Sequence, residues 1–268
     1  MSLILVATDF SPVADNALRY ACKLALAQNT SISILHSYSL PLLVGDLSIA
    51  TPIADFQEDA EQRMKQLLAS ISGDFPQITF KTQVVYGDMV DAINDVTVGE
   101  TPMLVIVGNS YTPDNPTWMD STLLEALRHL NYPVLAVPDS TGYEQVRKIG
   151  FVYDNDLKGS IEALKQLNDI VLQLGAELHV YTATPEDNTS TEINEDARQI
   201  LKAANPLYHV SASTNIDEDI LTFVGKYHID WLVVMPRRHS FFESLFHKSH
   251  TRALVNSAFI PVMALHER

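Results

Sequence analysis

The sequence predicts an α/β protein built from two tandem Rossmann-like domains, each with a five-stranded, mostly parallel sheet flanked by helices. Three observations predict this fold class. Short, unbroken apolar runs such as Leu3–Ala7 are typical of strands that are buried on both faces of a parallel sheet. Between these runs, apolar residues recur at the spacing of amphipathic helices. The same order of runs and helices then occurs a second time within the 268 residues.

In the first half, Ser11 and Pro12 mark the start of the first helix. A serine side chain accepts a hydrogen bond from a free N–H group of the first turn, and proline at the first helical position has no N–H to leave unpaired. Thr122 and Glu125 have the spacing of a capping box at the start of the last helix. The strands are expected at residues 3–7, 31–38, 79–85, 103–107 and 132–137, and the helices at residues 12–28, 54–70, 88–96 and 122–130.

The second half repeats this order after a polar segment that has no periodicity. This segment predicts a first domain at residues 1–139, a linker at residues 140–146 and a second domain at residues 147–268. Asp154 follows the first strand of the second half as Asp9 follows the first strand of the chain. The strands of the second half are expected at residues 148–153, 177–182, 207–211, 231–235 and 260–265, and the helices at residues 157–174, 193–204, 216–226 and 249–257.

The charge of the chain argues against two classes of partner. With 33 acidic and 18 basic residues, the net charge is -15, and a nucleic acid or a membrane surface would favour a positive face. The first 139 residues carry 6 basic against 16 acidic residues, and the remaining residues carry 12 against 17. The second half therefore repels an anion less than the first half does.

Cys22 is the only cysteine, which excludes a disulfide within the chain and fits a reducing compartment. Cys22 lies on the same face of the predicted helix as Leu18 and Ala25, so we expect it in the core and not as a reactive thiol. The sequence has neither a basic-then-apolar leader nor an apolar run of about 18 residues. We therefore expect a cytoplasmic protein.

A basic loop, residues 236–252, follows one of the apolar runs of the second half. A strand, a loop and the start of a helix together favour an anion, because the first N–H groups of a helix have no partner within it. The loop therefore predicts a site for a small phosphate-bearing ligand; the alternative is that its arginines are solvated or pair with the acidic first domain. Its charged residues are Arg237, Arg238, Lys248, Arg252 and the single acid Glu243.

Neither a metal site nor a catalytic group is predicted. His239, Glu243, His247 and His250 do not have the spacing of a closed zinc set. The sequence also has no Walker A motif and no arrangement that resembles a Ser/His/Asp or Cys/His nucleophile.

Taken together, these features resemble the universal stress protein family in its tandem two-domain form. The resemblance is carried by Ala7–Pro12 after the first strand, by Val85–Asp88 after the third, and by the strand–loop–helix–strand endings of both halves. The endings Tyr132–Pro138 and Phe259–Leu265 match the last strand of the family, and the resemblance covers nearly the whole chain. It implies that the two halves pair as a pseudo-dimer through their last strands; a homodimer of the whole chain is left open.

The resemblance also implies where a nucleotide would bind. Members that bind ATP carry a Gly-x2-Gly-x9-Gly-Ser/Thr loop after the fourth strand, whose glycines let the backbone approach the phosphates. The loop spacing is kept in both halves, but two of the three glycines are missing from the first half and all three from the second. The matching residues are Gly108, Tyr111, Ser121 and Thr122 in the first half, and Met235, Arg238, Lys248 and Ser249 in the second.

The adenosine-contacting aspartate of such members matches Asp9 and Asp154, although each of these could instead only start or cap a helix. We therefore expect ATP or another adenine nucleotide with Mg²⁺ at a modified site. Its residues would be Asp154, Arg238, Lys248 and Ser249 in the second half, with a weaker counterpart at Asp9, Gly108, Ser121 and Thr122 in the first.

Three functions are open from the sequence. A stress-response binding or sensor module with a degenerate nucleotide site is favoured, because charged side chains stand where the glycines of the loop would be. A slow ATP hydrolase would need Mg²⁺ and a group that positions water, for which only Asp154 or Glu243 is available. The third function is a structural or adaptor protein that binds no nucleotide.

Overall fold

The computed structural model describes residues 3–39, 53–109, 130–153, 161–184, 193–212, 216–235 and 260–266. The first half contains β1 (Leu3–Ala7), α1 (Pro12–Gln28), β2 (Ser31–Tyr38), α2 (Ile53–Asp74), β3 (Phe80–Tyr86), α3 (Met89–Val96), β4 (Leu104–Asn109) and β5 (Val134–Pro138). The second half contains β6 (Lys148–Val152), α5 (Ile161–Leu174), β7 (Glu177–Thr184), α6 (Glu195–Leu201), the short 3-10 helix η1 (Lys202–Ala204), β8 (Leu207–Ala212), α7 (Ile216–Tyr227), β9 (Trp231–Val234) and β10 (Val262–Ala264).

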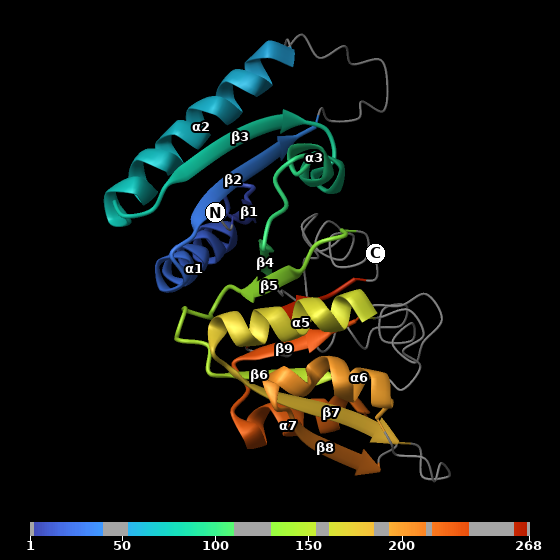
Figure 1. Cartoon of the computed structure of the whole chain (residues 1–268). Helices are drawn as coiled ribbons and strands as arrows, with labels where there is room; N and C mark the ends of the chain where they lie inside the picture. The colour runs from blue at the N-terminus through green and yellow to red at the C-terminus, as the bar shows by residue number, and fades with distance from the viewer. Residues whose placement is uncertain are drawn as a thin grey trace.

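All ten of these strands form one sheet, in the order β3-β2-β1-β4-β5-β10-β9-β6-β7-β8. Read outward from the centre, the two halves have the same strand order, and the strands within each half are parallel. The halves meet where β5 and β10 pair antiparallel, with Leu135 opposite Met263. In Figure 1 the first half lies above the second along this sheet. The predicted fold class is confirmed, and the last strands of the two halves pair as expected.

Two apolar cores cover the two faces of the sheet, and each core runs through both halves. Alternate residues of β1 divide between them, since Ile4 and Val6 belong to one core and Leu5 and Ala7 to the other. The first core is completed by α1, α2, α5 and α6, and the second by α3 and α7. Because neither core stops at the junction, the two halves bury their apolar surfaces together.

The start of α1 follows the sequence prediction. The Ser11 side chain accepts a hydrogen bond from the Ala14 N–H at 3.2 Å, and Pro12 occupies the first helical position. The helix ends at Asn29, whose φ of 51° is the left-handed conformation common at helix ends. Cys22 is buried on this helix, so its predicted core position is confirmed.

Some predicted boundaries are wrong. The helix predicted at residues 54–70 continues to Asp74 as α2, because Ile71 is buried and extends the apolar face. The strand predicted to end before Gly108 includes that residue, which pairs with Val137 of β5. The helix predicted at residues 193–204 is divided into α6 and η1. The predicted capping box at Thr122 and Glu125 lies outside the described residues.

The segment between the halves packs against α1. The Asn16 side-chain amide donates hydrogen bonds to the carbonyl oxygens of Pro138, at 2.9 Å, and Thr141, at 3.1 Å. The ring of Tyr143 lies edge-on to that of Tyr20, with their centroids 5.1 Å apart. The predicted linker therefore makes specific contacts, although its exact boundaries stay a prediction. No helix in the described part of the chain combines the length and the hydropathy that a membrane crossing needs.

Candidate strand-end nucleotide site

In each half, the strand order reverses beside the first strand, which is where ligands of open α/β sheets bind. In the first half, β1 lies between β2 and β4, with Val6 opposite Ile34 and Ile106. In the second half, β6 lies between β7 and β9, and Phe151 takes the place of Val6. Asp9 and Asp154 therefore follow equivalent strands in the two repeats.

Asp9 forms a local turn before α1. One of its carboxylate oxygens accepts a hydrogen bond from the Ser11 N–H at 2.9 Å, and the Phe10 N–H bonds to the Thr8 hydroxyl at 3.0 Å. Phe10 has a φ of 63°, in the left-handed region that few residues other than glycine adopt. The Asp9 carboxylate thus shapes the turn that leads into the helix through one of its two oxygens.

Gly108 lies at the close approach of β4 to the first turn of α1. A Cβ atom at this position would lie 2.9 Å from the Val13 side chain and 2.9 Å from the Val13 carbonyl oxygen. Helix packing therefore explains the glycine without a ligand, as in sites where glycine permits close contact between a helix and a strand.

The second half has Met235 in the equivalent place. The register fixes this equivalence, because Ile106 lies opposite Val6 as Val233 lies opposite Phe151. Met235 is 4% exposed and belongs to the same core as α5. A buried thioether therefore stands in the second half where the first half has the close contact between Gly108 and α1.

The remaining predicted site residues are not placed by the structure. Asp154, Arg238, Lys248 and Ser249 of the second half lie outside the described residues, and so do Ser121 and Thr122 of the first half. The described residues Tyr153 and Met235 stand directly before two of these segments, at the ends of neighbouring strands. Tyr153 and Met235 themselves therefore lie at the same edge of the sheet.

Three residues that the sequence analysis did not connect with the site meet beside Asp9. The His36 ring lies 4.3 Å from the Phe10 ring, and the Arg63 guanidinium carbon lies 4.6 Å from the centre of the Phe10 ring. The His36 Nδ1–H donates to the Thr8 carbonyl oxygen at 2.7 Å, which leaves Nε2 of the neutral ring as an acceptor. Burial is the main reason that the pKa of His36 lies below its usual value, and Arg63 lowers it further.

This cluster places one guanidinium and one neutral imidazole at the strand ends of the acidic half. It was not predictable from spacing, because Arg63 lies on α2, which is separated from Phe10 in the chain by α1 and β2. Among the described residues, no group of three or more His, Cys, Asp or Glu side chains is arranged to hold a metal ion.

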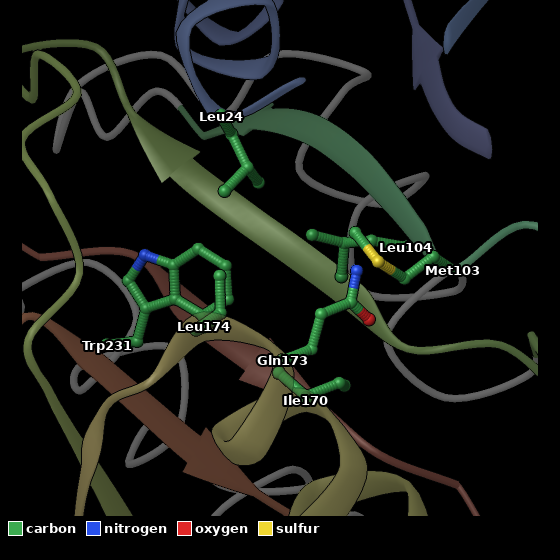
Figure 2. Close-up of a pocket in the computed structure, with 7 residues that line it drawn as sticks. All are labelled: Leu24, Met103, Leu104, Ile170, Gln173, Leu174 and Trp231. Carbon is green, nitrogen blue, oxygen red and sulfur yellow. The ribbon is translucent and has the colours of Figure 1, made fainter. Parts of the chain in front are cut away.

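A small pocket between the halves is a poorer candidate for a ligand. It lies where α1, β4, α5 and β9 meet, and its walls are mainly apolar (Figure 2). Its free volume is about 10 Å³, which is room for about one water molecule. A nucleotide does not fit it. The lining residues are Leu24, Met103, Leu104, Ile170, Gln173, Leu174 and Trp231.

The comparison with protein families agrees with this repeated architecture. The model of the universal stress protein family matches residues 1–138 and matches again at residues 145–266. The chain belongs to the universal stress protein family. It carries two copies of the family's domain, as the sequence resemblance implied.

Two solved structures illustrate the shared fold. The chain is 16% identical to a universal stress protein from Archaeoglobus fulgidus DSM 4304, with a TM-score of 0.71 and coverage of 99% of this chain and 96% of that one. It is 18% identical to a putative universal stress protein from Pseudomonas aeruginosa UCBPP-PA14, with a TM-score of 0.58 and coverage of 99% and 93%. At these identities the likeness concerns the fold alone. A comparison with curated proteins gave no match.

Proposed function

We propose that this tandem universal stress protein is a stress-response binding module with a degenerate nucleotide site in its second half. Degenerate here means that the glycines of the family's loop are replaced. The ligand is an adenine nucleotide with Mg²⁺, held through its phosphates by the side chains of Arg238 and Lys248 and the hydroxyl of Ser249. Asp154 takes the place of the adenosine-contacting aspartate.

The observation that carries the proposal is Met235 in the place of Gly108. A buried side chain at the start of the loop argues against the close backbone wrapping that glycines allow. Phosphate recognition then depends on charged side chains, and arginine and lysine form the stronger, charge-assisted hydrogen bonds with phosphate. Binding at such a site lowers the conformational entropy of long side chains, which costs free energy, so we expect weak binding.

The first half supports a nucleotide less well. Gly108 is explained by the contact with α1, and one Asp9 oxygen is engaged with Ser11. The net charge of this half also disfavours phosphate. Its site at Asp9, Gly108, Ser121 and Thr122 is therefore proposed as the weaker of the two.

Calorimetry on the intact chain tests the proposal, with ATP, ADP and AMP each titrated in the presence of Mg²⁺. We expect dissociation constants of about 10 μM to 1 mM in the wild type and a loss of about tenfold or more in Lys248→Ala, because one charge-assisted hydrogen bond is removed. Lys23→Ala is the matched control, since it removes the same charge from an exposed position on α1. No binding at millimolar nucleotide, or equal binding by the two variants, contradicts the proposed site.

A structural role for the first half is the second candidate, and the β5–β10 pairing favours it. The first half closes the edge of the second half's sheet and completes both apolar cores. This role is compatible with a ligand in the second half. ATP hydrolysis is tested separately from both functions, by measuring phosphate release. Equal release by the wild type and by Lys248→Ala would rule out a hydrolase.

A further inference from the structure

Two histidines are in contact on β7 and β8, the last two strands at the outer edge of the second half's sheet. His179 lies on β7 and is 2% exposed, whereas His209 lies on β8, the edge strand of the sheet, and is half-buried. Their ring nitrogens, Nδ1 of His179 and Nε2 of His209, are 3.0 Å apart, and the two rings are nearly parallel. The other nitrogen of His179 faces the carboxylate of Glu177.

Helix α7 covers this pair. The Tyr227 ring lies 4.1 Å from the His209 ring and 5.5 Å from the His179 ring, measured between centroids. The Phe223 ring lies 5.4 Å from His209. The histidine contact thus joins β7 to β8, and the two rings also pack against the last turns of α7.

The arrangement limits the number of protons that the pair can hold. Glu177 accepts a hydrogen bond from Nε2–H of His179, so a neutral His179 presents a bare Nδ1, and His209 must donate its Nε2–H. One extra proton is accommodated on Nδ1 of His209 without disturbing this bond. A second extra proton puts hydrogens on both facing nitrogens, 3.0 Å apart, and the contact has to break.

The surroundings of His209 also disfavour a proton on its ring. Burial lowers the pKa of His209, and His179 and Lys226 lower it further. Among the described residues, the titratable groups on this face include Glu177 and Tyr181 on β7, Lys148 on β6, and Asp219, Lys226 and Tyr227 on α7.

We propose that the His179–His209 contact is a proton-operated latch: it holds β8 and α7 on β7 while the two rings share at most one extra proton, and it opens when both are protonated. In the open state both rings reach water and each takes its own proton, so opening gains one proton. Protons are conserved, because the additional one comes from solvent. Acidification below about pH 6.5, the ordinary pKa of histidine, therefore loosens the edge of the second half.

Hydrogen exchange on the intact chain tests the latch, with exchange rates corrected for the intrinsic effect of pH. One additional proton bound in the open state lowers the protection of the amides of Leu207–Ala212 by at least about 25-fold between pH 7 and pH 5. His209→Phe keeps a ring against α7 but removes the nitrogen that faces His179, so the closed and open states hold the same number of protons and we expect a change below about twofold. His228→Asn is the matched control; it removes an exposed histidine next to α7 and tolerates the positive φ of that position, so it should behave as the wild type.

A wild type without this loss of protection, or an equal loss in His209→Phe, overturns the proposal. If His209→Phe does not fold, nuclear magnetic resonance of the wild-type histidine rings decides. The latch predicts that the second protonation of the pair coincides with the loss of protection in β8. Two rings that each titrate independently near pH 6.5 while β8 stays protected would refute it.

Discussion

Gly108 lies at the end of β4, where the first turn of α1 leaves no room for a side chain. The nearest atoms to an added Cβ include the Val13 carbonyl carbon and oxygen, which cannot move without shifting the helix. A glycine predicted as part of a phosphate loop thus has a packing role that is visible only in the folded chain. Spacing alone could not separate these two explanations.

We expect Gly108→Ala to lower the free energy of unfolding by about 1–3 kcal/mol, because it overpacks the contact between α1 and β4. Urea denaturation followed by circular dichroism measures this change. Gly73→Ala on α2 is the matched control, since an added Cβ there meets no atom within 4 Å. It should stabilise the protein slightly or have no effect, as alanine is favoured over glycine in helices. Equal stability of Gly108→Ala and the wild type would refute the packing explanation.

Cys22 should be unreactive in the folded protein. Burial raises the pKa of its thiol to about 12, so at pH 8 only about one thiol in 10⁴ is ionised. Labelling by a thiol reagent at pH 8 should therefore be at least about 10³-fold slower in the native protein than in urea-unfolded protein. Similar labelling rates in the two states would contradict the buried position.

At the scale of elements, the strands were the most predictable feature. Parallel strands covered on both faces are unbroken apolar runs, and this signal located β1, β4 and β9 to within a few residues. The cap of α1 was predictable because Ser11 and Pro12 act locally. Contacts between elements distant in the chain were not predictable, since they depend on how the helices lie on the sheet.

The hydrogen bond between Trp231 and Tyr20 is such a contact. The indole N–H of Trp231, on β9, donates to the hydroxyl of Tyr20, on α1, at 2.6 Å, across 211 residues of sequence. Both side chains are buried, and burial raises the pKa of Tyr20, so its hydroxyl stays neutral. This bond ties the first helix of one half to the strand that leads into the basic loop of the other.

We expect Tyr20→Phe to lower the free energy of unfolding by about 1–3 kcal/mol, because the Trp231 N–H is left buried without a partner. Tyr143→Phe is the control, since it keeps the ring that packs edge-on against Tyr20, and its effect should stay within about 0.5 kcal/mol. Chemical denaturation of the two variants side by side gives the comparison. A Tyr20→Phe variant as stable as the control would show that the bond adds nothing to the junction.

At the scale of the whole molecule, the two repeats form one structural unit. The sheet passes from β5 to β10 without a break, and both cores contain residues of both halves. Duplication was predictable from the repeated order of runs and helices. That the two sheets become a single sheet of ten strands was only implied by the family resemblance, because nothing local in the last strands specifies their partner.

The fragment of residues 1–139 should therefore associate with itself. Without β10, the edge of β5 exposes backbone groups and a strand that is fully buried in the intact chain. Analytical ultracentrifugation should detect dimers or larger species of the fragment under conditions in which the intact chain keeps one defined mass. A fragment that stays monomeric and folded would count against the structural dependence of the halves.

The candidate site is the part that the sequence could predict least. Sequence spacing assigned Gly108 and Met235 to equivalent positions, and the strand registers agree with that assignment. Their different roles follow from packing against neighbouring helices, which no spacing reports. His36 and Arg63 were missed for the same reason, since their proximity to Asp9 arises from the fold.

A crystal structure of the intact protein grown with ATP and Mg²⁺ tests the central claim most directly. The proposed function predicts electron density for a nucleotide at the carboxyl ends of β6 and β9, with its phosphates contacted by Arg238 and Lys248. A nucleotide bound only beside Asp9 and Gly108, or density at neither site with millimolar ATP in the crystal, would contradict it.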